Sequence, residues 1–148
     1  MVTSEESFGR AGGGWLCGPE VPDGELLGAV AGFNADTLAR SPAAREWLAA
    51  RGVDAGLAAM VGVGFSDRSL GLSLPLKNRR AGAVLRSRLQ GFGVLRASGH
   101  EHLRGCVTVP VRDGDGAVVQ IVGYRVGRAR DERGIPATLA LDGLPGAV

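Results

Sequence analysis

Cys106-Val-Thr-Val-Pro-Val-Arg-Asp-Gly-Asp-Gly-Ala-Val-Val-Gln-Ile-Val122 is the stretch of sequence that decides the fold. Its first six residues alternate, and the run from Ala117 to Val122 is rich in β-branched side chains, as β-strands are. Two Asp-Gly pairs separate the runs, and such pairs favour a tight antiparallel turn. The sequence therefore predicts a β-hairpin at about residues 106–124. Pro110 lacks a main-chain donor, so we expect it at a strand edge or a bulge.

Two helices are predicted near the N-terminus, well before this hairpin. Apolar residues between Leu26 and Leu38 follow one helical face, and Asp23 is the expected cap. Ser41-Pro42 then opens a second helix, because serine suits the cap position and proline suits the first helical residue. The inward side chains of this second helix are predicted to be Ala44, Trp47 and Leu48, with Gly52 following its end.

Two further helices are predicted before the hairpin. Asp54 can cap a short helix that carries Leu57, Met60 and Val61 and that ends at Gly62 and Gly64. Residues 77–90 again have helical spacing, with Gly91 as the expected stop. Helices followed by a small antiparallel sheet define an α+β fold.

The length of 148 residues suits one domain. Residues 1–22 are rich in glycine and proline and are expected to be a flexible arm, residues 23–126 the folded domain, and residues 127–148 an irregular tail. The sequence has no apolar run long enough for a membrane span, and residues 1–10 have acids where a secretory signal would be basic. We therefore expect a cytoplasmic protein with no membrane partner and with Cys17 and Cys106 reduced.

Charge is distributed unevenly along the chain. The formal net charge is −5 for residues 1–39, +8 for residues 40–112 and −1 for residues 113–148. A basic middle segment suits a polyanionic partner, although an arginine-rich solvated surface would have the same composition. Arginine binds phosphate with a planar fork of donors that stays charged. The candidate nucleic-acid-binding residues are Arg51, Arg79, Arg80, Arg86, Arg88, Arg104, Arg112 and Arg125.

Metal chemistry is weakly indicated. Asp113 and Asp115 have a spacing that can hold Mg²⁺, but they stand in the predicted turn, where Asp and Gly serve the backbone. His100 and His102 precede Cys106 without a clear fourth ligand, so a loop with two titrating imidazoles is the favoured interpretation. We therefore expect no catalytic residue, metal site or cofactor in this chain.

Five segments resemble motifs of bacterial DnaG-type DNA primases, in the same order and with similar spacing. Three of them are Ala44-Arg-Glu-Trp-Leu-Ala-Ala-Arg-Gly-Val53, Met60-Val-Gly-Val-Gly-Phe65 and Gly91-Phe-Gly-Val-Leu95. The last two are His102-Leu-Arg-Gly-Cys-Val-Thr-Val-Pro-Val-Arg-Asp113 and the run from Gly114 to Arg125. Each motif alone is weak, but together they cover residues 25–126.

The resemblance implies the N-terminal subdomain of the RNA-polymerase core, a mixed α/β unit that holds template DNA and primer duplex. Arg51 and Arg125 match basic residues of the nucleic-acid groove, and Arg104 and Arg112 match further motif positions. The family has an upstream zinc-binding domain and a following Toprim domain, which binds Mg²⁺ and carries the catalytic acids. The sequence printed here contains neither of them, and the tail lacks the family's lysines, for which Arg128, Arg130 and Arg133 are possible substitutes. These departures are typical of primase relatives on mobile elements.

Three hypotheses follow from the sequence. The first is the template-binding part of a primase-like protein, catalytically incomplete alone, with single-stranded DNA or a DNA/RNA primer duplex as its ligand. A separate Toprim-containing chain or a replicative helicase would be its protein partner. The second is a non-catalytic interaction module derived from a primase, whose acidic arm contacts a partner or covers the basic face. The third is a small metal-dependent enzyme that uses Asp113, Asp115 and the two histidines.

Overall fold

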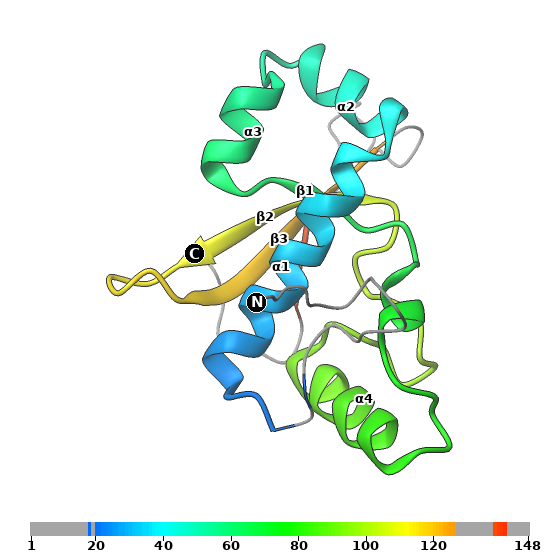
Figure 1. The fold of residues 1–148 in the computed structure, drawn as a ribbon. Helices are drawn as coiled ribbons and strands as arrows, with labels where there is room; N and C mark the ends of the chain where they lie inside the picture. Colours follow the sequence, from blue (N-terminus) through cyan, green and yellow to red (C-terminus); the bar gives the residue numbers. More distant parts are fainter. Residues whose placement is uncertain (1–17, 19, 127–137, 142–148) are drawn as a thin grey trace, which may run out of the picture.

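The computed structural model describes residues 18, 20–126 and 138–141, and they form the predicted α+β fold (Figure 1). The helices are α1 (Asp23–Ala39), α2 (Pro42–Ala49), α3 (Ala55–Val61) and α4 (Arg80–Phe92), with a short 3-10 helix η2 (Leu70–Ser73). The strands are β1 (Gly64–Phe65), β2 (Cys106–Arg112), β3 (Val118–Arg125) and β4 (Thr138–Ala140). Strand β4 lies where the sequence predicts an irregular tail; three residues are too few to show a period.

The predicted hairpin is confirmed as the β2–β3 pair, in which Thr108 faces Gly123. Within the described residues, the strands form one antiparallel sheet in the order β1-β2-β3-β4. Pro110 pairs with Ile121, just before a register shift between Val111 and Arg112. Because β1 pairs with β2 only as far as Thr108, no described strand lies beyond β2 at Pro110. The expectation of an edge or bulge position is therefore confirmed.

The hairpin turn explains the two acidic residues between the strands. The Asp113 carboxylate accepts hydrogen bonds from the main-chain N–H of Asp115 at 2.8 Å and of Ala117 at 3.1 Å. Gly116 has φ +88°, a left-handed conformation that favours glycine. The turn interpretation of Asp113 and Asp115 is thus confirmed.

One of the three predicted helix caps, Asp23, differs from expectation, whereas Ser41 and Asp54 occupy the N-cap positions as predicted. Pro22 occupies the N-cap of α1, and the Asp23 carboxylate instead binds Arg88 Nη2 of α4 at 2.6 Å. Ser41 precedes α2 as predicted, but its hydroxyl donates backward to the Thr37 carbonyl at 2.9 Å. Asp54 caps α3 as predicted, because its carboxylate accepts from Leu57 N at 2.8 Å.

Glycine positions at two helix ends need correction. Gly91 lies inside α4, and Gly93 ends that helix with φ +86°. Gly62 ends α3 with φ +88° as predicted, but Gly64 belongs to β1. Both errors arise where two glycines are separated by one residue, because only the tertiary fold decides which of the two adopts the left-handed conformation.

The large apolar residues that the sequence predicts for α3 are exposed. Leu57, Met60 and Val61 are 42%, 81% and 40% exposed, and Ala58 is the buried residue of the helix. Every residue of α3 is apolar or glycine, so the pattern alone could not select a face.

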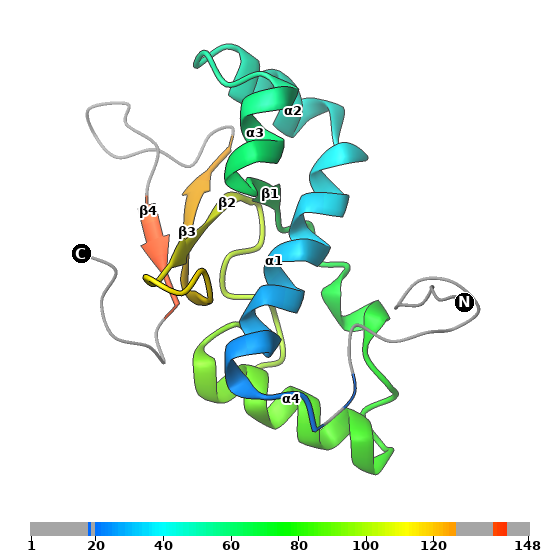
Figure 2. The ribbon, with the colours of Figure 1, turned by 60° about the vertical axis from the view of Figure 1, so that its left-hand side comes forward.

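Helix α1 crosses one face of the sheet and joins two apolar clusters (Figure 2). Its N-terminal half contributes Leu26 and Leu27 to the larger cluster, together with Leu85 and Leu89 of α4. Its C-terminal half contributes Leu38 to a second cluster with residues of α2, α3 and β2. Both figures show α2 and α4 at opposite ends of α1. No helix in the described ranges is long and apolar enough to cross a membrane.

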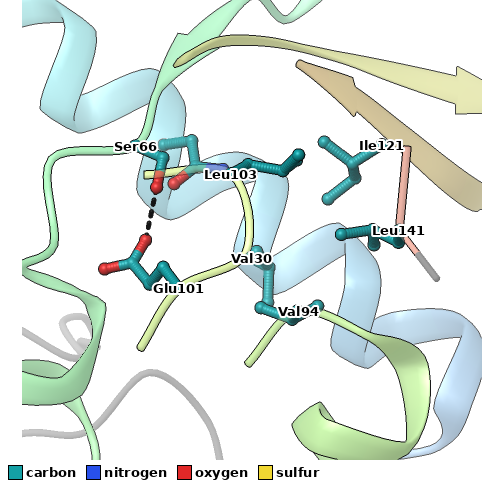
Figure 3. A pocket seen from close by; sticks show the side chains of 8 residues that line it. Val30, Ser66, Val94, Glu101, Leu103, Ile121 and Leu141 are labelled. Carbon is teal, nitrogen blue, oxygen red and sulfur yellow. Dashed lines mark hydrogen bonds between the residues drawn. The ribbon is translucent and has the colours of Figure 1, made fainter. Parts of the chain in front are cut away.

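A buried carboxyl group fixes the loop that precedes β2. Glu101 is 7% exposed and accepts hydrogen bonds from Ser66 Oγ at 2.5 Å and from Leu70 N at 3.0 Å. Figure 3 shows it beside a cavity of about 10 Å³ that is lined mostly by apolar side chains. Burial raises the pKa of Glu101 above its ordinary value, although the bonds from Ser66 and Leu70 lower it in part.

We predict a pH-dependent difference in stability between the protein and its Glu101→Gln variant. Because the pKa of Glu101 is raised by folding, the protonated carboxyl is favoured in the folded state, and this contribution is lost as the pH rises through the folded pKa. Urea unfolding from about pH 4 to about pH 7 should show wild-type stability falling relative to the variant. A difference that stays constant with pH would contradict the prediction.

Gly64→Ala should destabilise the fold strongly. A Cβ atom at Gly64 would lie 2.5 Å from the carbonyl carbon of Asn34 in α1, so the helix and strand would have to separate. We expect a loss above about 2 kcal/mol, as for overpacked cores. Gly32→Ala, on the exposed side of α1 with no atom within 4 Å, is the matched control and should stabilise by about 0.5–1 kcal/mol. Equal unfolding midpoints for the two variants would refute the close approach.

Candidate nucleic-acid interface

Arg51 is held in place by the end of α2. Its guanidinium carbon lies 3.8 Å from the centroid of the Trp47 ring, and its Nη1 donates to the Trp47 carbonyl at 3.0 Å. The four-residue spacing on a helical turn brings the two side chains together. Stacking and one hydrogen bond orient the exposed guanidinium before any ligand binds. Sequence reasoning gave Trp47 only a core role and missed this function, which the spacing could have indicated.

Arg125 and Arg104 lie at the same end of the domain as Arg51. Arg125 ends β3, and the next residue, Val126, packs in the apolar cluster to which Trp47 belongs. Val126 N donates to the carbonyl of Gly105 at 3.2 Å, directly after Arg104. Arg51, Arg104 and Arg125, which we call the α2-end arginines, are thus connected through Val126. Val126 packs in the cluster of Trp47 and donates its N–H to Gly105.

The pKa of the Cys106 thiol is affected by burial and by the charge of Arg125. Cys106 is fully buried and pairs with Arg125 across the hairpin, as expected for a strand cysteine. Burial raises the pKa of the Cys106 thiol, and the positive charge of Arg125 opposes the rise.

Arg112 lies at the other end of β2. Six residue steps along an extended strand separate it from Cys106 by about 20 Å. Its Nη1 donates to the carbonyl of Gly116 at 3.3 Å, and its Nη2 would lie 3.2 Å from a Cβ atom at Gly62. Arg112 therefore spans from the hairpin to the end of α3 and is not adjacent to the α2-end arginines.

Arg79, which precedes α4, and the α4 residues Arg80, Arg86 and Arg88 lie at the opposite end of α1 from the α2-end arginines. Arg79 and Arg80 are exposed at the start of α4. Arg86 Nη1 donates to the carbonyls of Pro75 and Gly82, and Arg88 forms the ion pair with Asp23. The eight candidate arginines thus form no single cluster, and four of them bind groups within the domain: Arg51, Arg86, Arg88 and Arg112.

No group of three or more His, Cys, Asp or Glu side chains within the described residues is arranged to hold a metal ion. Asp113 serves the turn, and Glu101 points into the core between its two histidine neighbours. His100 Nδ1 lies 3.0 Å from Ser98 Oγ, and Arg96 Nε donates to His102 Nδ1 at 3.4 Å. Arg128, Arg130 and Arg133 lie outside the described residues.

The molecule is thus a small α+β domain with a basic, partly pre-oriented surface at one end. No protein-family model matches the chain, and no curated protein matches it. Its fold matches solved structures of DnaG-type primases, which confirms for the fold the resemblance that the motifs indicated.

Three of these structures illustrate the match. A DNA primase domain from Pseudomonas aeruginosa is 25% identical, with a TM-score of 0.63 over 84% of this chain and 39% of that one. A DnaG primase catalytic domain bound to ssDNA is 22% identical, with a TM-score of 0.56 over 84% of this chain and 39% of that one. The RNA polymerase domain of Mycobacterium tuberculosis primase DnaG in complex with double-stranded DNA is 23% identical, with a TM-score of 0.59 over 78% of this chain and 37% of that one. This chain therefore spans less than two fifths of each structure.

Arg86→Ala should lower stability, because the substitution removes donors from the buried carbonyl of Pro75 and from that of Gly82. We expect a loss of about 1–2 kcal/mol in urea unfolding. Arg80→Ala removes the same charge from an exposed position of the same helix and should change stability by less than about 0.5 kcal/mol. Indistinguishable midpoints would show that Arg86 has no structural role.

Proposed function

We propose that this chain is the template- and primer-binding part of a DNA primase-like protein and is catalytically incomplete alone. The observation that carries the proposal is the Arg51–Trp47 stack beside Arg125 and Arg104, on a fold that solved primases share. Two of the three matched structures described above contain DNA, one single-stranded and one double-stranded.

The chemistry of the α2-end arginines suits a phosphate backbone. A guanidinium presents two parallel N–H groups to two phosphate oxygens, and Arg51 has already lost much of its freedom by stacking on Trp47. Contacts to phosphate position a strand without reading its sequence. We therefore assign Arg51 and Arg125 as the principal contacts, with Arg104 beside them and Arg112 as a more distant contact along the hairpin.

The remaining parts of a primase reaction would come from elsewhere. Magnesium and the catalytic acids belong in a Toprim domain, either further along a longer chain or on a separate one. A replicative helicase is a second candidate partner. The proposal places the protein in DNA replication, with a primase of a mobile element as one setting. RNA primer synthesis would require the Toprim part.

A second candidate function, protein interaction, is favoured by the outer side of α3. Leu57, Met60 and Val61 expose aliphatic surface on a helix that has one buried residue. Exposed apolar patches often mark protein contacts. Such a surface suits docking of a catalytic chain, so this function is compatible with the first.

Arg51→Ala and Arg125→Ala should each weaken binding of single-stranded DNA roughly tenfold, because each removes a charge-assisted contact. Fluorescence anisotropy across a salt series should show the logarithmic salt slope fall by about 0.7 for each substitution, similarly for oligonucleotides of different sequence.

Arg80→Ala is the control for general loss of positive charge, since Arg80 lies on α4 at the far end of α1. It should leave the affinity within about twofold at moderate salt, where distant charges are screened. Absence of binding by the unmodified protein at low salt would sink the proposal, and an equal loss in Arg80→Ala would remove the α2-end arginines from the site.

A further inference from the structure

Helices α1, α2 and α3 surround an apolar hollow of about 410 Å³. Alanine is its commonest lining residue, and such small side chains leave the space between the helices unfilled. The largest apolar side chains around the hollow are Leu38, Leu48, Val53 and Val63.

The hollow is open to solvent and has two charged residues in its lining. Ala39, Ala55 and Ala59 line it and are exposed, so a ligand can enter from outside. Arg45 of α2 is exposed, and no hydrogen bond or ion pair to the described residues holds its guanidinium. The carboxylate of Asp54 already accepts the capping hydrogen bond from Leu57 N. Arg45 is therefore the positively charged group of the lining, whereas Asp54 contributes a negative charge.

Main-chain groups offer little to a polar ligand here, because the three helices satisfy most of their amides internally. Hollows of about 300–1,000 Å³ with apolar walls and a few polar groups are typical of small-molecule sites. The walls would accept an aliphatic chain or a ring, and Arg45 would accept an anionic group.

We propose that this hollow binds a small amphipathic carboxylate, with its apolar part between α1, α2 and α3 and its carboxylate on Arg45. The site lies outside the α2-end arginines and is independent of the proposed function. A bound apolar group would add contacts to α3, which has Ala58 as its buried residue. Ligand binding should therefore stabilise the folded protein.

The test uses isothermal titration of the full chain with sodium decanoate, decanol and decyltrimethylammonium at equal ionic strength. We expect saturable binding of decanoate at one site, weaker binding of decanol and the weakest binding of the cation. No saturable heat with decanoate would overturn the proposal, and equal affinity for the cation would overturn the role of Arg45.

Three variants locate the site. Arg45→Gln should reduce decanoate affinity roughly tenfold and leave decanol unchanged, because only the ionic contact is lost. Ala59→Phe should weaken both ligands by filling the hollow, whereas Met60→Phe, on the opposite side of α3 and outside the lining, should weaken neither. Circular dichroism checks that each variant is folded. Equal weakening by Ala59→Phe and Met60→Phe would place the ligand elsewhere and overturn the assignment.

Discussion

Helix α1 lies directly on strand β1 at Gly64, where any side chain would enter the main chain of Asn34. This close approach fixes the distance between the helix and the sheet, and α1 contacts β1, β2 and β3. Both apolar clusters include residues of α1, so the helices α2 and α4 are held at its two ends. The ion pair between Asp23 and Arg88 adds a contact at the α4 end, and at that exposed position it is worth at most about 1 kcal/mol.

Because α2 and α4 lie at opposite ends of α1, arginines that belong to one basic segment of the sequence, residues 40–112, lie far apart in the fold. A helix of 17 residues is about 25 Å long, so the arginines at the α2 end and those at the α4 end lie about one helix length apart. The α2 end also contains the Trp47 platform, which holds Arg51 through its ring and its carbonyl. Pre-orientation reduces the entropy lost when a phosphate binds.

The hairpin, the α+β class and the primase-like fold could be predicted because their signals are local and ordered along the chain. The Asp-Gly pairs act within a few residues, and the cap of α3 needs only Asp54. The face of α3, the burial of Glu101 and the grouping of the arginines could not be predicted, because each depends on which distant segment packs alongside. Glu101 illustrates this, since two polar histidines flank a carboxyl whose partners come from residues 66 and 70.

The most direct test of the central claim is an NMR titration with a single-stranded oligonucleotide that follows arginine Nε–H groups and the Trp47 indole N–H. The account predicts that signals of Arg51, Arg104, Arg125 and Trp47 shift together and saturate at one concentration. Signals of the α4 residues Arg86 and Arg88 should stay unchanged. Shifts confined to α4, or an absence of shifts at low salt, would contradict it.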